Sequence, residues 1–165
     1  MNTKLIALGL LASVAATPAM AQDIVGDFTG ARVGVELGVV DDDFAGTDEA
    51  TYGVLAGYDV DLGSVIVGAT ASYTGLFDDD GADLRDLTLV GRVGGKLAPA
   101  TMVYGTVGYS NLDADNFAGS LDGVRFGVGL EHDFGPVYAN LETRYSDYEA
   151  GVELYQTVVG LGVRF

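Results

Sequence analysis

Residues Glu153–Phe165, ELYQTVVGLGVRF, end the chain and alternate between two unlike faces. Counting back by twos from the terminus gives one face, made of Phe165, Val163, Leu161, Val159, Thr157 and Tyr155. The other face holds Arg164, Gly162, Gly160, Val158 and Gln156. A period of two is that of a β-strand. An apolar face with aromatic ends, opposite glycines and one arginine, is typical of a strand with lipid on one side and a narrow polar interior on the other.

The first 21 residues predict a targeting segment. Lys4 precedes the apolar run Leu5–Ala16, and Ala19-Met20-Ala21 matches a small-x-small cleavage site. The run has 12 residues, whereas a spanning helix needs about 20. We therefore expect a cleaved signal peptide at residues 1–21 and a single domain at residues 22–165.

Composition narrows the class of that domain. No apolar run after residue 21 reaches spanning length, so the domain can cross a bilayer only as a closed β-barrel. Twenty-five glycines argue against a helical fold, and the lack of cysteine excludes thiol chemistry. The net charge of −16 argues against nucleic acid as a partner. A hydrophobic content of 48% argues against disorder.

Eight segments after Gly30 alternate in polarity and predict eight strands. They cover residues 31–39, 52–60, 64–74, 86–97, 101–110, 123–134, 137–146 and 153–165. Each has about the 9–11 residues that a tilted strand needs to cross hydrocarbon. Short turns at 61–63, 98–100 and 135–136 alternate with longer polar links at 40–51, 75–85, 111–122 and 147–152. This is the pattern of an up-and-down barrel.

The two faces of these segments differ in charge. One face of every segment carries no charged residue, while the other face holds Arg32, Glu36, Asp59, Arg92, Lys96, Arg125, Glu131, Asp133, Glu142, Arg144 and Arg164. A Lys or Arg facing lipid costs about 2–4 kcal/mol at the bilayer midplane, so we expect these charges to point inward. Six are basic and five acidic, which suits mutual neutralisation in a filled interior better than an ion pathway.

Aromatic residues on the uncharged face fall near its two ends. With the N-terminus on the periplasmic side, the outer belt would be Tyr52, Tyr73, Tyr109, Tyr145 and Tyr155, and the inner belt Tyr58, Phe134 and Phe165. Two aromatic belts mark the two membrane interfaces.

Strand number, loop alternation, belts and the terminal phenylalanine resemble the small eight-stranded bacterial outer-membrane barrels of the outer-membrane protein A, outer-membrane protein X and opacity-protein group. The resemblance spans the mature chain. It implies an all-β, eight-stranded antiparallel up-and-down transmembrane β-barrel with short periplasmic turns and longer extracellular loops. It also implies an outer-membrane location and a role for Phe165 as the signal read by the barrel assembly machinery. A soluble β-sandwich or a lipocalin-like barrel is the alternative fold.

The predicted loops are rich in carboxylates, which suits a solvated repulsive surface. Oxygen ligands also suit hard cations, so weak Ca²⁺ or Mg²⁺ binding, bridging to lipopolysaccharide, is the alternative. Its candidate ligands are Asp41, Asp42, Asp43, Asp78, Asp79 and Asp80. No loop has the spacing of a calcium-binding helix-loop-helix motif, and we expect no other cofactor.

His132 is the only histidine and the one candidate for catalysis. It falls on the uncharged face near Phe134, and the sequence shows no partner for it, whereas a nucleophile and its base must lie within hydrogen-bond reach. We therefore expect a non-enzymatic protein with a structural, adhesive or envelope-integrity role. Its partners would be outer-membrane lipid, lipopolysaccharide and an unknown surface ligand. A narrow porin-like channel and a lipid-A-modifying enzyme are the alternative functions.

Overall fold

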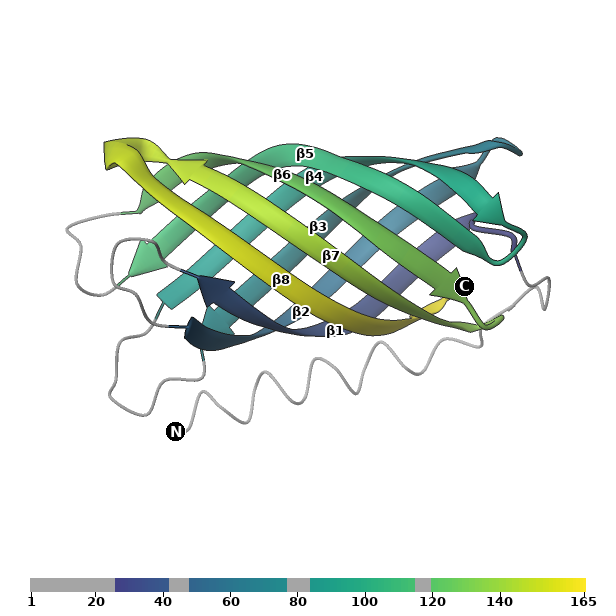
Figure 1. Cartoon of the computed structure of the whole chain (residues 1–165), viewed down its shortest axis with the longest axis horizontal. Coiled ribbons are helices and arrows are strands. Elements are labelled where there is room, and N and C mark those ends of the chain that lie inside the picture. The colour runs from purple at the N-terminus through teal and green to yellow at the C-terminus, as the bar shows by residue number, and fades with distance from the viewer. Residues whose placement is uncertain (1–25, 42–47, 77–83, 115–119) are drawn as a thin grey trace.

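In the computed structural model the chain forms one closed barrel of eight antiparallel strands, each paired with its sequence neighbours, with the last paired to the first (Figure 1). The structure describes residues 26–41, 48–76, 84–114 and 120–165. The strands are β1 (Gly30–Asp41), β2 (Asp48–Asp61), β3 (Val65–Leu76), β4 (Leu84–Ala98), β5 (Thr101–Ala114), β6 (Leu121–Asp133), β7 (Val137–Tyr148) and β8 (Val152–Arg164). One short helix, η1 (Glu149–Gly151), joins β7 to β8. The predicted fold class is confirmed.

The predicted strand boundaries were wrong at the end where the longer links lie. Strand pairing there includes Val40↔Glu49, Gly75↔Arg85 and Asn111↔Asp122, all placed in loops by the sequence. The cause is that antiparallel hydrogen bonds continue past the apolar zone, whereas the prediction followed apolar residues. Asp48, Glu49, Asp113, Asp122 and Asp147 therefore lie in strands, not in loops.

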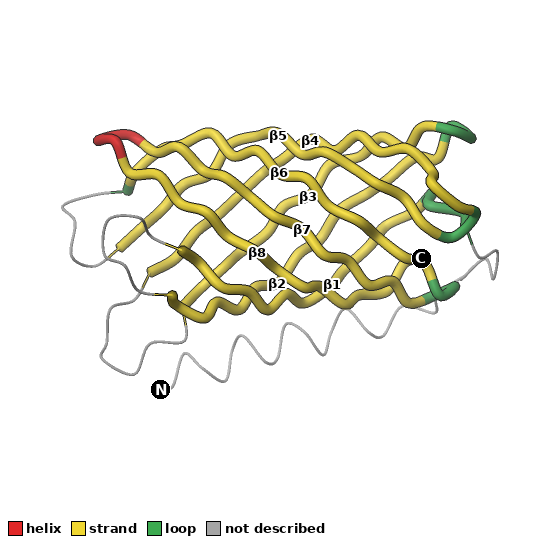
Figure 2. The backbone as a smooth tube through the Cα atoms, viewed as in Figure 1, coloured by secondary structure: helices red, strands yellow, loops and turns green. Residues whose placement is uncertain are grey.

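The three short connections share the other end of the barrel, which we call the short-turn end; η1 lies at the opposite, long-loop end (Figure 2). Two of the turns are built alike. The Gly63 N–H donates to Asp61 (2.8 Å) and the Gly135 N–H to Asp133 (2.7 Å), and both glycines have φ of 98°. An aspartate that hydrogen-bonds two residues ahead, followed by a left-handed glycine, makes a tight turn between strands.

The barrel is apolar outside and polar inside. Leu37 is 61% exposed and Leu161 56%, whereas Arg32 is 4% exposed and Asp59 fully buried. A lipocalin-like barrel in water would bury its leucines, so this distribution excludes the alternative fold. Among the described residues, no helix has the length and hydropathy to cross a membrane.

Candidate functional site

The interior is filled by charged and hydroxyl side chains, which form three clusters along the barrel axis. The eleven residues with predicted inward charges all lie on the inner side of their strands, and ten of them are buried. The exception is Lys96, whose side chain is 25% exposed at the short-turn mouth. We call the clusters inner, middle and outer, counting from the short-turn end.

The inner cluster joins three arginines to two carboxylates. Asp59 Oδ2 lies 3.0 Å from Arg32 Nε, 3.6 Å from Arg92 Nη1 and 3.5 Å from Arg164 Nη1. Glu131 accepts from Arg92 Nη2 (2.8 Å) and Arg164 Nη2 (2.6 Å). These five side chains come from β1, β2, β4, β6 and β8, so the cluster crosses the whole lumen.

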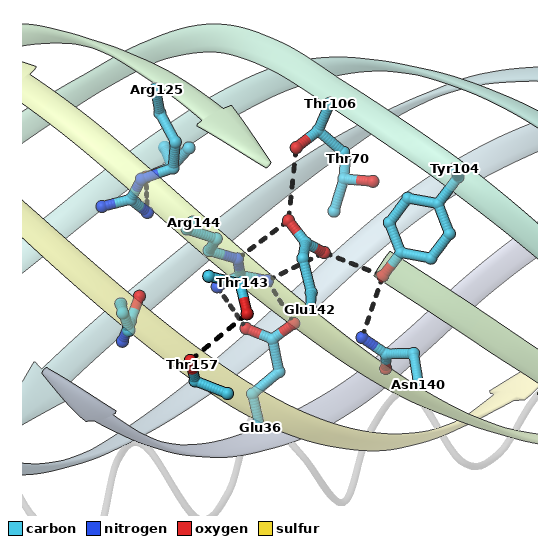
Figure 3. Close-up of polar contacts among 12 residues, drawn as sticks. Glu36, Thr70, Tyr104, Thr106, Arg125, Asn140, Glu142, Thr143, Arg144 and Thr157 are labelled. Carbon is cyan, nitrogen blue, oxygen red and sulfur yellow. Dashed lines mark hydrogen bonds and ion pairs between the residues drawn. The ribbon is translucent and has the colours of Figure 1, made fainter. Parts of the chain in front are cut away.

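The middle cluster has the opposite balance, with one arginine between two carboxylates (Figure 3). Arg144 Nη2 lies 2.6 Å from Glu36 Oε1, and its Nε lies 3.0 Å from Glu142 Oε1. The Tyr104 hydroxyl donates to Glu142 Oε2 (2.8 Å) and accepts from Asn140 Nδ2 (3.2 Å). The Tyr104 ring also lies 4.0 Å from the Arg92 guanidinium carbon, which connects the middle and inner clusters.

The outer cluster pairs Arg125 with Asp86, which is 4% exposed. Arg125 also donates to Thr88 Oγ1 (2.7 Å) and Ser146 Oγ (2.8 Å). Asp86 was not among the predicted inward charges, although it lies on the same strand face as Arg92, six residues earlier in the chain. With it, the three clusters contain five arginines and five carboxylates, so the charges of the three clusters balance.

Little empty space remains among these side chains. The interior cavity between the inner and outer clusters offers about 20 Å³ to water centres. One water needs roughly 10–15 Å³ by this measure, so the cavity has room for about one molecule. An eight-stranded barrel is just wide enough for side chains to fill it, and here they do.

The short-turn mouth is closed by the residues before β1. Phe28 is fully buried there, and Asp61 forms an ion pair with Lys96 (2.6 Å). Burial would raise the pKa of the Asp61 carboxyl, but hydrogen bonds from Lys96 and from the N–H groups of Gly63 and Phe28 lower it overall. Neither Phe28 nor Asp61 was singled out in the sequence.

The predicted belt residues lie on the outer surface. Tyr52, Tyr73, Tyr109, Tyr155, Tyr58 and Phe134 are exposed, while Tyr145 and Phe165 are half-exposed. The Tyr145 and Tyr155 rings approach with centroids 5.0 Å apart at the long-loop end. At the other end, the Phe165 N–H donates to the Ala31 carbonyl (2.8 Å), so the last residue is held against β1.

Exposed carboxylates gather at the long-loop end, and we call them the acidic rim: Glu49, Asp113, Asp122, Asp147, Glu149 and Glu153. Hydrogen bonds from the Tyr109 hydroxyl and the Asn111 amide lower the pKa of Asp122, so this carboxylate stays charged in mild acid. Arg85 lies at this end of the barrel as well, at the start of β4.

The proposed cation ligands fall largely where the structure gives no description. Asp42, Asp43, Asp78, Asp79 and Asp80 lie outside the described residues, as does the side chain of Asp41. The expected signal peptide, residues 1–21, lies outside them too. Within the described part of the chain, no three acidic, histidine or cysteine side chains are grouped as a metal site would need.

His132 has a partner that the sequence did not reveal. Its Nδ1 lies 2.8 Å from Thr101 Oγ1, and its ring packs edge-on against Phe134 with centroids 4.5 Å apart. The sequence showed no partner because Thr101 is 31 residues away and is set opposite His132 only by the β5–β6 register. The pair lies on the outer surface at the short-turn end, and no carboxylate among the described residues is hydrogen-bonded to the imidazole.

Comparison with known proteins supports the architecture. A family model described as an outer membrane protein beta-barrel domain matches residues 7–165. No curated protein matches the chain. Three solved structures that resemble it cover 81–83% of this chain and 96–99% of their own.

The first is Ail, the attachment invasion locus protein of Yersinia pestis, in complex with the heparin analogue sucrose octasulfate, at 16% identity and a TM-score of 0.58. The second is Neisserial surface protein A, at 11% identity and a TM-score of 0.56. The third is the outer membrane enzyme PagL, at 13% identity and a TM-score of 0.62. At these identities the likeness shows the fold alone.

Proposed function

The chain belongs to the family of outer membrane protein beta-barrel domains, and from this premise we propose that it is a non-conducting, non-enzymatic surface barrel with a structural or adhesive role. The protein lies in the bacterial outer membrane, with its short turns toward the periplasm and its long-loop end outside the cell. The observation that supports the proposal is the filled lumen, in which the charges of the three clusters balance. With the interior closed, the outer end is the part of the barrel that remains free to meet other molecules.

The lumen argues against the porin-like alternative. Five arginines and five carboxylates neutralise one another in buried clusters, and an ion that entered would have to break these pairs in a space of about one water. We expect the refolded barrel to give no steady single-channel steps in planar bilayers. A large porin inserted under the same conditions is the positive control, and reproducible unitary steps from this barrel would overturn the proposal.

The Thr101–His132 pair is the one feature that favours the enzyme alternative. It lacks an acidic partner among the described residues, and it lies at the periplasmic end, whereas lipid A occupies the outer leaflet. We expect lipid A mass spectra to be identical with and without expression of the protein. A new lipid A species that disappears in the His132→Ala variant would establish an enzyme.

The acidic rim supports a cationic rather than a polyanionic surface ligand. The six exposed carboxylates would repel a sulfated ligand such as the one bound to Ail. We expect the barrel in detergent to bind immobilised polylysine at low salt and to elute as salt rises, and to flow through immobilised heparin.

A charge-reduced variant makes this test specific. Replacing Asp113, Asp147 and Glu153 with their amides halves the described acidic rim without touching the lumen. We expect elution from polylysine at lower salt. The control replaces Asp27 at the periplasmic mouth with asparagine, which should leave retention unchanged. Retention on heparin, or equal retention of the rim variant, would contradict the assignment.

A further inference from the structure

The periplasmic mouth contains a feature that the strand pattern does not require. Residues 26–29, which precede β1, turn into the lumen and place Phe28 in a small apolar pocket. Phe28 is fully buried there with Ile66, Met102 and Tyr104, three residues from β3 and β5. Among the described residues it is the one phenylalanine side chain buried in this interior, and it covers the inner charge cluster.

Charged side chains hold the backbone of this segment. Lys96 Nζ donates to the Gly26 carbonyl (2.9 Å), and the Gly26 N–H donates to Asp133 Oδ2 (3.1 Å). The Phe28 N–H donates to Asp61 Oδ2 (3.2 Å), and the Phe28 carbonyl accepts from Arg164.

The four anchoring residues come one each from β2, β4, β6 and β8. Even-numbered strands run toward the short-turn end, so their last inward side chains converge there. The Phe28 ring also lies 5.6 Å from Lys96 Nζ and 5.4 Å from the Arg164 guanidinium carbon, at cation–π distance. The same two cations therefore bind both the backbone and the ring.

The fit of the segment in the mouth depends on its side chains as well as on its backbone. Gly26 has φ of 92°, and a Cβ there would lie 2.2 Å from the Pro99 carbonyl oxygen, so no other residue fits. Thr29 Oγ1 accepts from the Asp61 N–H (2.9 Å). The Asp27 carboxylate instead accepts from the Thr29 N–H within the segment (2.9 Å). The contacts at the mouth therefore depend on the identity of Gly26, Phe28 and Thr29. The Asp27 carboxylate makes its hydrogen bond within the segment instead.

We propose that the periplasmic mouth is a peptide-recognition site for the sequence Gly-x-Phe-Thr, and that the chain's own residues 26–29 occupy it as a releasable seal. The barrel closes through its eight strands alone, so the segment can leave without breaking a strand pair. Release would expose Met102, Ile66 and the inner charge cluster to periplasmic water. Tethering gives the segment an effective concentration of about millimolar, which keeps the site filled by its own chain.

The first test uses the unaltered full chain refolded in detergent micelles. Met102 is the only methionine after Met20, so its ¹³C-methyl signal reports on the pocket. We expect this methyl to be protected from a water-soluble paramagnetic agent, and the Gly26 and Phe28 amides to exchange slowly with solvent. Exchange of both amides at the rate of an unstructured peptide would overturn the proposal.

The second test empties the site and fills it again from outside. In the full-length Gly26→Ala/Phe28→Ala variant we expect paramagnetic broadening of the Met102 methyl to rise about tenfold or more, a factor appropriate to losing one buried phenyl ring. The Asp27→Ala variant is the matched control and should behave as the unaltered chain. Heat-modifiable migration on detergent gels verifies that each variant is a folded barrel.

Synthetic acetyl-Gly-Asp-Phe-Thr-amide is then added to the double variant. We expect a saturable return of the Met102 signal toward its original position, with no response to analogues carrying Ala for Gly or for Phe. The unaltered chain should not respond, because its site is occupied. Equal responses to all three peptides, or no response, would overturn recognition. If the double variant does not fold, amide exchange of Gly26 and Phe28 in the unaltered chain decides whether the segment occupies the site.

Discussion

Asp59 is the carboxylate that faces the most arginines in the described lumen. It is fully buried and faces three arginines, and Glu131 is the only other carboxylate in its cluster. Removing one partner of a buried ion pair leaves an uncompensated charge, at a cost of about 3–5 kcal/mol. We expect Asp59→Asn to lower the free energy of unfolding by about that amount, measured by urea titration of the folded band on detergent gels.

Asp147→Asn is the control for that change. Asp147 is exposed on the acidic rim, where losing a charge has little effect on stability. Equal unfolding midpoints for the two variants would show that the inner cluster does not depend on Asp59.

Which residues point inward could be predicted from the sequence, whereas their pairings could not. Alternation alone places Arg92 and Glu131 on inner faces, because a period of two leaves no other side for a charge. It does not say that they meet, since the pairing depends on how far each strand is displaced along the barrel. The same alternation places Asp86 on the inner face. It was missed because the count of inward charges left out the first residue of the segment 86–97.

At the scale of the strand, the space available for a Cβ atom at a glycine depends on the face that the glycine occupies. A Cβ on Gly162, an inward position of β8, would lie 2.4 Å from the Val33 carbonyl oxygen and 2.5 Å from the Tyr138 ring. A Cβ on Gly105, on the lipid-facing side of β5, would meet nothing closer than 3.7 Å. We expect Gly162→Ala to destabilise the barrel by about 1–3 kcal/mol through overpacking.

Gly105→Ala should be neutral or stabilising by less than about 1 kcal/mol, because it restricts the unfolded chain. Both variants are compared by urea unfolding in the same detergent. A larger cost at Gly105 than at Gly162 would contradict the assignment of the two faces.

The segment formed by residues 26–29 is the second element with a testable property, which is its response to acid. The pKa of Asp61 is lowered in the docked state, so its contribution to docking is complete above the ordinary value of about 4 and is lost as pH falls through the lower docked value. Asp133 is the second carboxylate facing the segment, and Lys96 is the cation beside Asp61. We expect paramagnetic broadening of the Met102 methyl to increase between pH 6 and pH 3 in the intact barrel.

Asp61→Asn isolates the part that Asp61 plays in this acid response. The variant should show greater broadening already at pH 6 and a smaller further rise in acid, since the Asp61 carboxylate is no longer there to lose its charge. Broadening that stays constant, or that falls in acid, would show that Asp61 does not hold the segment in place.

The docking of residues 26–29 in the mouth could not be predicted from the sequence. Phe28 precedes the first strand, so it has no periodic neighbours that would assign it a face. Its burial depends on the ends of β2, β4, β6 and β8 meeting around one point, which exists only after the barrel closes. The predicted strands ended too early at the long-loop end for a related reason, because backbone pairing there continues without apolar side chains.

At the scale of the whole molecule, the apolar exterior suits the outer membrane, and the end of the last strand is the place to test how the barrel is assembled. Phe165 follows β8 beside β1, where the barrel closes, and it is half-exposed. It takes no part in the interior charge clusters, so a role in recognition by assembly machinery can be separated from a role in stability.

We expect Phe165→Ala to refold in detergent with an unchanged urea midpoint, yet to yield several-fold less heat-modifiable barrel in the outer-membrane fraction of cells. Phe134→Ala is the matched control, because Phe134 is a second exposed aromatic of the inner belt and is not terminal. It should leave both the midpoint and the yield unchanged. Equal yields for the two variants in cells would remove the assembly role of Phe165, and a lowered midpoint for Phe165→Ala in detergent would assign its effect to stability instead.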